Sequence, residues 1–241
     1  MPVSADASDR RKRFYAEAGV APADGGFAVT LDGRMPRSPE GRRLVLPTAG
    51  LAELVAAEWE AQAGDIVPAA MPATRLAWTA IAFGAGEGAE AAVARLAAFA
   101  GSDLLCYFAE EPRALVERQE RAWTPVLAWA ERSLGVQFHR TRGIVHRRQP
   151  EVTIRRIEAL AAAEDAFVLA GLSAAAPLFG SAILAFALRH GELTAEAVFA
   201  LSRLDETFQE ERWGVDEEAA ARTAAMAAEA QLLSRWFAAL K

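Results

Sequence analysis

The residues best suited to chemistry lie in one segment, LDETFQEERWG, at positions 204–214. It carries a close set of acidic, amide and aromatic side chains: Asp205, Glu206, Gln209, Glu210 and Trp213. Adjacent carboxylates can share a proton in acid–base catalysis, bind a metal ion, or fix the register of a protein interface. They can also be no more than the solvated face of a helix. Which of these applies depends on where the helix directs each side chain.

On a helix with about 100° per residue, three apolar side chains form a core stripe: Leu201, Leu204 and Phe208. Asp205 and Gln209 border this stripe. Glu206 and Glu210 lie on the opposite flank, with Trp213 between the flanks. Neighbouring residues diverge by about 100°, so the two adjacent carboxylates need a group from another element to share a proton or a metal ion. The segment alone does not make a catalytic or metal site.

Two interpretations of the segment stay open. In the first, its charges cap and solvate the helix, and Asp205 pairs with Arg212 two turns further on. In the second, Asp205 and Gln209 bond to another element, because polar groups at the edge of an apolar stripe need hydrogen-bond partners. The tryptophan at the helix end, Trp213, adds weight to the second.

The other candidate motifs lack the context that their chemistry requires. GAGEG at 84–88 has neither the third spaced glycine nor the preceding strand of a dinucleotide-binding loop, so we interpret it as an interhelical loop. The single cysteine, Cys106, excludes an internal disulfide and a cysteine-cluster metal site, and its apolar neighbours indicate a core position. No zinc-type pair at helical spacing occurs among the histidines: His139, His146 and His190. No cofactor and no metal are expected.

Composition and charge describe a globular chain that does not bind nucleic acid. Of 241 residues, 53% are hydrophobic and 24% charged, which is too apolar for a disordered chain. The net charge is -6 and the pI about 5.3, whereas a nucleic-acid binder has a basic face. The one basic stretch, HRTRGIVHRR at 139–148, lacks the interleaved aromatic residues on which bases stack.

No targeting or membrane segment is predicted. No apolar run approaches the ~20 residues that span a bilayer. The start, MPVSADASDRRKRF, has no apolar centre, and Asp6 and Asp9 disfavour a mitochondrial transit peptide. We expect a monomer in the bacterial cytoplasm, or in the mitochondrial matrix if the source is eukaryotic, without membrane insertion.

The first part of the chain is predicted to form a small antiparallel meander covered by a helix. Turn signals at Asp32-Gly33 and Pro39-Glu40-Gly41 separate three extended segments: 27–31, 34–38 and 43–47. Thr48 caps a helix that runs through 51–62 and ends before Gly64. A meander this short cannot bury itself, so we expect the helix to cover one of its faces.

Helical signals dominate from residue 72 onward, and the predicted helices cover 72–83, 89–100, 103–111, 112–134, 150–163, 165–189, 194–214 and 216–240. The stretch 165–189 is apolar on most sides, which is typical of the centre of a bundle. Thr194 is the predicted cap of the helix that carries the 204–214 segment, and Asp216 that of the last helix. Short extended segments flank Thr141-Arg142. The prediction is an α+β fold, mostly α, with an N-terminal α+β domain at 1–70 and a helical domain at 71–241.

Several separated motifs together resemble a known family. They are RFY (13–15), LDGR (31–34), LVLPT (44–48), EWEAQ (58–62), IVPAAMPAT (66–74), DLLCY (103–107), QERAWTP (119–125) and LDETFQEERWG (204–214). In this order and spacing the chain is similar to the assembly chaperones of the ATP synthase F1 sector that attend the alpha subunit. The chain departs from the usual pattern at Phe108, Thr124 and Ala82-Phe83, each of which lacks a charge common in the family.

The resemblance implies a chaperone and not an enzyme. Such a protein binds the unassembled alpha subunit and prevents its aggregation until the beta subunit replaces the chaperone. The implied fold is a small N-terminal α+β domain followed by an orthogonal helical bundle. It also implies that partner-binding residues are those of the 204–214 segment: Asp205, Glu206, Gln209, Glu210 and Trp213.

Two other function classes remain open at this point. One is an acid–base hydrolase that uses Asp205, Glu206 and a distant histidine such as His139. The divergence of the two acids and the lack of a positioned nucleophile count against it. The other is a purely structural bundle with an unrelated partner.

Overall fold

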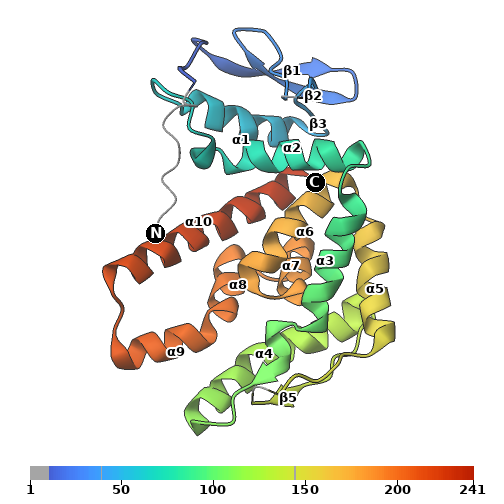
Figure 1. Cartoon of the computed structure of the whole chain (residues 1–241), viewed down its shortest axis with the longest axis vertical. Coiled ribbons are helices and arrows are strands. Elements are labelled where there is room, and N and C mark those ends of the chain that lie inside the picture. Colours follow the sequence, from blue (N-terminus) through green and yellow to red (C-terminus); the bar gives the residue numbers. More distant parts are fainter. Residues whose placement is uncertain (1–10, 39, 144) are drawn as a thin grey trace. The chain divides into compact units, whose positions relative to one another are not determined.

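The fold is α+β and mostly helical, as predicted (Figure 1). A computed structural model describes residues 11–38, 40–143 and 145–241. The predictions that rest on Asp6, Asp9 and Pro39 lie outside the described residues, as does residue 144 in the extended segment predicted after Thr141-Arg142. The chain divides into two compact units: one runs to Ile81 and includes Ala238–Lys241, and the other is Ala82–Phe237.

The first unit contains a three-stranded antiparallel sheet in the order β1-β2-β3. Its strands are β1 (Ala18–Ala23), β2 (Gly26–Leu31) and β3 (Val45–Leu46). β2 and β3 fall in predicted extended segments, whereas 34–38 contributes only two isolated bridges, of Arg34 with Leu31 and of Arg37 with Arg43. β1 was not predicted, because AGVAPA has few residues that favour strands and is held by its pairing with β2.

The helix that covers the sheet begins and packs as predicted. α1 (Ala49–Glu60) is capped by Thr48, whose hydroxyl accepts a hydrogen bond from the Leu51 amide. Its buried side is formed by Leu51, Ala52, Val55 and Ala56. In Figure 1, α1 lies along the sheet, and it contacts all three strands. The Thr48 hydroxyl also donates to the Ala239 carbonyl at 2.5 Å, which ties the chain end to this unit.

The start of the next helix is bonded into the first unit, so this compact unit continues past residue 70, where the sequence analysis places a domain boundary. After a short 3-10 turn, η2 (Pro68–Ala70), helix α2 runs over Pro72–Gly84. The Glu58 carboxylate accepts hydrogen bonds from the Ala73 amide at 2.6 Å and the Thr74 amide at 2.7 Å. It also accepts one from the Thr74 hydroxyl at 2.8 Å. This carboxylate caps α2 from α1, so the compact unit extends to Ile81.

The second unit is a helical bundle with a small parallel pair of strands. Its helices are α3 (Ala89–Gly101), α4 (Arg113–Leu134), α5 (Glu151–Ala162), α6 (Ala166–Phe179), α7 (Ala182–His190), α8 (Ala195–Ser202), α9 (Leu204–Trp213) and most of α10 (Glu217–Ala239). Every residue from Ala182 to Leu188 is buried. α7 packs against α3, α4, α6 and α8, which confirms the central position predicted for this apolar stretch (Figure 1).

Long-range hydrogen bonds change three of the predicted helices. The 103–111 segment forms a short 3-10 turn, η3 (Leu104–Cys106), and then β4 (Tyr107–Phe108), which pairs in parallel with β5 (Thr141–Arg142). β5 therefore consists of Thr141 and Arg142, and the extended segments were predicted on either side of these two residues. The 165–189 stretch is two helices that meet at Gly180-Ser181, and the 194–214 stretch breaks at Arg203. Thr194 therefore caps α8, and not α9, which carries the 204–214 segment.

The buried carboxylate of Asp103 explains the first two changes. It accepts hydrogen bonds from the Ser181 hydroxyl at 2.7 Å and from the Ile183 and Leu105 amides at 3.1 Å. These bonds fix the 103–106 turn to the start of α7, so tertiary partners replace helical ones. Burial raises the pKa of Asp103 to about 6, although the hydrogen bond from Ser181 and those from backbone amides oppose the shift.

Replacing Glu58 with alanine should lower the free energy of unfolding by about 1–3 kcal/mol, because two amides and a hydroxyl at the start of α2 lose their acceptor. Urea denaturation followed by circular dichroism measures the change. Glu53→Ala is the matched control, since Glu53 is an exposed residue of the same helix. Equal effects of the two substitutions would contradict the capping role.

Asp103 should make the protein more stable at mildly acidic pH. Its pKa is raised in the folded state, so the native protein takes up a proton before the unfolded chain does, and this stability is lost as the pH rises through about 6. Between pH 7 and pH 5 the gain from this group should be about 1 kcal/mol. It is measured as the difference in pH dependence of unfolding between the wild type and Asp103→Asn, and parallel curves would contradict it.

Candidate functional site

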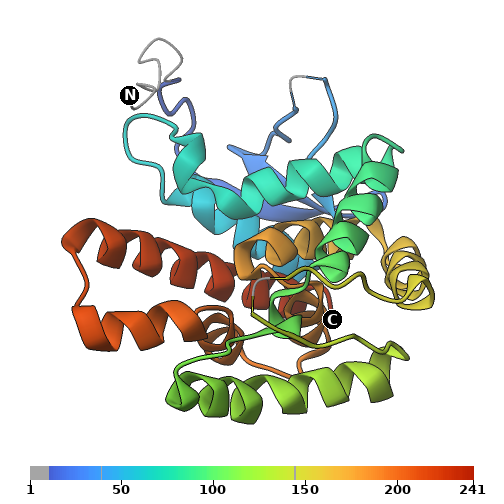
Figure 2. The same ribbon diagram turned by 60° about the horizontal axis from the view of Figure 1, so that its bottom comes forward.

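Helix α9 begins at Leu204 because a backbone carbonyl near the end of α8 accepts a hydrogen bond from a tryptophan side chain and not from the next helical turn. The indole N–H of Trp123 on α4 donates to the Leu201 carbonyl at 3.1 Å. In a continuous helix that carbonyl would accept from the amide of Asp205. The chain turns at Arg203, and α9 then packs against α4, next to which it lies in both views (Figures 1 and 2). Leu204 and Phe208 are buried, as the core stripe predicts.

Asp205 is held by a buried amide from a distant part of the chain. Its carboxylate accepts a hydrogen bond from the side-chain nitrogen of Gln119 at 2.7 Å. The side-chain oxygen of Gln119 in turn accepts from the Ala109 amide at 2.7 Å, and Gln119 is fully buried. Partial burial raises the pKa of Asp205, the bond from Gln119 lowers it, and the charge of Glu206 raises it further. Of the two open interpretations, the structure supports the one in which Asp205 bonds to another element.

Two other acidic side chains of α9 form ion pairs within the protein. Glu210 pairs with Arg203 at 2.6 Å, and both side chains are largely covered. Glu211 pairs with Arg118 on α4 at 2.9 Å. The predicted pairing of Asp205 with Arg212 is wrong, because the Arg212 guanidinium lies 4.0 Å from the centroid of the Phe208 ring and Asp205 bonds to Gln119.

Three of the five predicted partner-binding residues are exposed and lie along one side of α9. They are Glu206, Gln209 and Trp213, and we call them the α9 surface. At about 100° per residue they fall within about 60° of one another. The Trp213 side chain is 77% exposed, which is unusual for so large an apolar group. The five predicted partner-binding residues thus separate into two that are bonded within the protein, Asp205 and Glu210, and three that form the α9 surface.

Asp205 also lines a surface hollow that the sequence did not predict. The hollow has a volume of about 480 Å³ and is lined by Tyr107, Phe108, Ala109, Glu110, Glu111, Gly143 and Asp205. Three of these residues are acidic, so the hollow favours a positively charged group. The pair Glu110-Glu111 is the signal in the sequence, and it lies near Asp205 because Gln119 bonds both to the Ala109 amide and to Asp205.

The residues of the hydrolase alternative, Asp205, Glu206 and His139, are not linked by hydrogen bonds among the described residues. The His139 amide donates to the side-chain oxygen of Gln149, and its Nδ1 lies 3.3 Å from the Arg148 carbonyl. No hydrogen bond among the described residues links His139 to Asp205 or Glu206. Within residues 11–38, 40–143 and 145–241, no group of three or more His, Cys, Asp or Glu side chains could hold a metal ion. No helix in this part of the chain has the length and apolar character needed to cross a membrane.

Comparison with known proteins identifies the family. The family model described as ATP12 chaperone protein matches residues 12–131. The structure of Atp12 from Paracoccus denitrificans has a TM-score of 0.87 and 40% sequence identity, and the match covers 95% of this chain and 98% of that one. The chain belongs to the ATP12 chaperone family. An Asp-to-Lys mutant of the Paracoccus protein matches with the same coverage and TM-score at 39% identity.

The chain is also similar to a eukaryotic protein and to a further bacterial structure. The mitochondrial protein atp12 of Schizosaccharomyces pombe is 28% identical over an alignment of 219 residues, and the match covers 86% of this chain and 75% of that protein. The Atu1473 protein of Agrobacterium tumefaciens matches at 41% identity with a TM-score of 0.89 over 96% of this chain and 87% of that one. These matches confirm the assignment to the ATP synthase assembly chaperones, whose role is not enzymatic.

Loss of the Asp205 carboxylate should destabilise this ATP12 family member. Asp205→Ala leaves the buried nitrogen of Gln119 without an acceptor, so the free energy of unfolding should fall by about 1–3 kcal/mol. Asp205→Asn keeps an acceptor oxygen and should cost less. Glu211→Ala removes only an exposed ion pair on the same helix and should cost about 1 kcal/mol or less. Chemical denaturation measures all three, and equal losses would contradict a structural role for Asp205.

Proposed function

We propose that this protein binds the unassembled alpha subunit of the ATP synthase F1 sector and prevents its aggregation until the beta subunit takes its place. Membership of the ATP12 chaperone family supports an assembly role. The observation that carries the choice of contact residues is the α9 surface, where Trp213 is 77% exposed beside acidic and amide side chains. We further propose the bacterial cytoplasm as the compartment.

The physical character of the α9 surface suits a replaceable contact. Protein interfaces draw most of their binding energy from a few Trp, Tyr and Arg side chains, and charges around them set orientation. A single exposed tryptophan with one carboxylate and one amide along the helix provides such an anchor over a small area. Small contacts bind weakly enough to be displaced, which a chaperone needs because its client must leave.

The bonds beneath the α9 surface keep it in one conformation before the client arrives. The Gln119–Asp205 bond, the Arg203–Glu210 pair and the Arg118–Glu211 pair all hold α9 to its neighbours or to its own start. A contact surface that is already ordered loses less conformational entropy on binding. The two bonded residues of the segment, Asp205 and Glu210, therefore support client binding indirectly.

The acidic hollow beside Asp205 adds an electrostatic feature to the same unit. Glu110 and Glu111 line it together with Asp205, and carboxylates in a hollow attract positively charged groups of a partner. We propose that a basic side chain of the client occupies this hollow while the tryptophan of α9 is covered.

Substitutions on the α9 surface should impair client protection without lowering stability. Purified alpha subunit is diluted from denaturant, and its aggregation is followed by light scattering with and without the protein. Glu206→Lys and Trp213→Ala should each raise the chaperone concentration needed to suppress aggregation by about tenfold. The melting temperature should change by less than about 2 °C, because both side chains are exposed.

Glu229→Lys is the matched control for charge, because Glu229 is an exposed acid on α10 and the substitution changes the net charge by the same amount. It should leave protection unchanged. If the wild-type protein neither suppresses scattering nor elutes with the alpha subunit on gel filtration, the proposed client is wrong. If the substitutions lower the melting temperature as well as the protection, Glu206 and Trp213 act by stabilising the fold and not by contacting the client.

A further inference from the structure

Two motifs of the family resemblance that the α9 surface does not use meet in the first unit. These are RFY at 13–15 and LDGR at 31–34. The outer residues of the first motif are structural. The Arg13 guanidinium donates to the Tyr15, Glu60 and Gln62 carbonyls at 2.7–3.0 Å. Tyr15 is buried, and its hydroxyl donates to the Trp59 carbonyl at 2.6 Å.

Three residues of the second motif also have structural roles. Leu31 is buried in the small core beside Tyr15. The Asp32 carboxylate accepts hydrogen bonds from the Ala16 amide at 2.9 Å and the Glu17 amide at 3.0 Å. Asp32 and Gly33 have φ values of 49° and 75°, so they form the left-handed part of the turn that closes between Leu31 and Arg34.

Phe14 and Arg34 are the two members of these motifs whose side chains are exposed and make no hydrogen bond among the described residues, although the Phe14 ring lies edge-on to the Tyr15 ring with 5.4 Å between the centroids. Phe14 is 68% exposed, although burying an aromatic ring is strongly favourable. Arg34 is exposed, and among the described residues its guanidinium has no ion-pair or hydrogen-bond partner. An exposed aromatic ring and an unpaired guanidinium are the side chains that interfaces use most.

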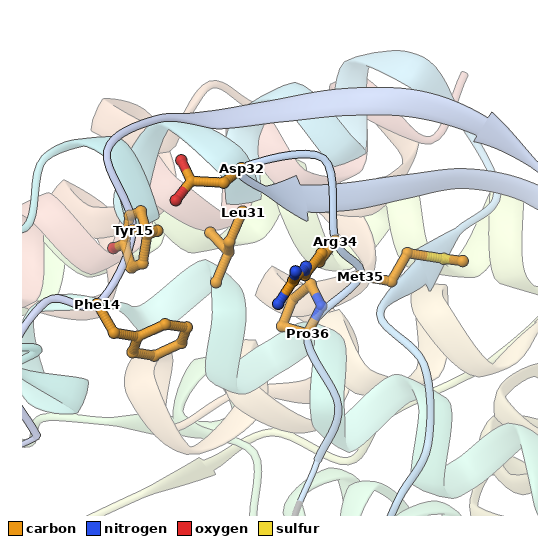
Figure 3. Close-up of a pocket in the computed structure, with 7 residues that line it drawn as sticks. All are labelled: Phe14, Tyr15, Leu31, Asp32, Arg34, Met35 and Pro36. Carbon is orange, nitrogen blue, oxygen red and sulfur yellow. The ribbon is translucent and has the colours of Figure 1, made fainter.

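The two residues line the same pocket. Figure 3 shows Leu31 between Phe14 on one side and Arg34 with Pro36 on the other. The cavity has a volume of about 380 Å³, and Met35, which also lines it, is 38% exposed. Its walls are mostly apolar, and its two charged groups are the guanidinium of Arg34 and the carboxylate of Asp32. The Asp32 carboxylate is bonded to the Ala16 and Glu17 amides, which leaves the guanidinium as the charged group available to a partner.

The charge around the pocket selects an acidic partner. Residues 31–43 carry four arginines, at positions 34, 37, 42 and 43, against Asp32 and Glu40, in a chain whose net charge is -6. We propose that this pocket is a second docking site for the client, which binds an apolar side chain that has a carboxylate next to it in an extended segment. The apolar side chain contacts Phe14 and Leu31, and the carboxylate pairs with Arg34. The proposal rests on the proposed function only for the source of that segment.

The test uses the full chain labelled with ¹⁵N and a synthetic probe, the peptide Gly-Glu-Leu-Glu-Gly with blocked ends. Titration by heteronuclear NMR should shift the amide signals of Phe14, Gly33 and Arg34. Phe14→Ala should weaken binding about tenfold. Arg34→Glu should weaken binding of this peptide by a similar factor and should bind Gly-Lys-Leu-Lys-Gly in preference, because the charge of the site is reversed.

Two substitutions in the same unit serve as matched controls. Val67→Ala removes another exposed apolar side chain and Arg75→Glu reverses another exposed charge, and neither residue lines the pocket. Both should bind the acidic peptide as the wild type does. The proposal is overturned if millimolar peptide causes no shift at these amides, if acidic and basic peptides bind alike, or if Phe14→Ala binds as tightly as the wild type. Shifts of the same amides with protein concentration alone would place a second copy there and would also overturn it.

The link to the client is tested separately from the site. Phe14→Ala should reduce protection of the alpha subunit in the light-scattering assay, while Val67→Ala should not. If the wild-type protein forms no complex with the alpha subunit, the proposed function fails, and the peptide titration still decides whether the pocket binds an acidic–apolar segment. If protection is normal in Phe14→Ala, the client does not use this pocket.

Discussion

The arrangement around α9 depends on the fully buried side-chain amide of Gln119. Its oxygen accepts from the Ala109 amide after β4, and its nitrogen donates to Asp205 on α9. A buried amide that loses a partner cannot recover the bond from water, so the loss costs more than the bond contributes on average. The end of β4, α4 and α9 are therefore fixed to one another. Trp123, one turn further along α4, adds a bond to the Leu201 carbonyl and sets the place where α9 begins.

Other buried or half-buried carboxylates organise the fold in the same way. Glu58 on α1 accepts from the first amides of α2, and Asp103 accepts from the cap residue and an amide of α7. In each case a side chain satisfies helix-start groups that the helix itself leaves without partners. Many residues on the packed faces of these helices are alanines, which fit together in more than one register. Polar bonds of this kind select one register, because every other register leaves a buried polar group without a partner.

The division of roles within one motif bears on how such a chaperone works. In the α9 segment some residues are bonded inward and others are left exposed, and the same holds for the RFY and LDGR motifs of the first unit. The inward residues hold the backbone, and the exposed ones have a fixed direction. An interface built on a rigid frame needs few contacts, because little entropy is lost when a client binds. The exposed apolar groups then remain isolated side chains and not a large patch that would promote self-association.

The sequence by itself determined the features that depend on local chemistry. Thr48 and Asp216 begin helices because their side chains accept from nearby amides, and α7 is central because it is apolar on all sides. The ordered motifs were sufficient for the family. The tertiary structure alone decided the features that need distant partners: the strand β1, the pairing of β4 with β5, and the break at Arg203. It also decided which acids are available for contact. Asp205 borders an apolar stripe in any helical projection, but its partner lies 86 residues away in the sequence, and no periodic pattern encodes that distance. Phe14 and Arg34 likewise share a pocket only because the chain folds back through β1 and β2.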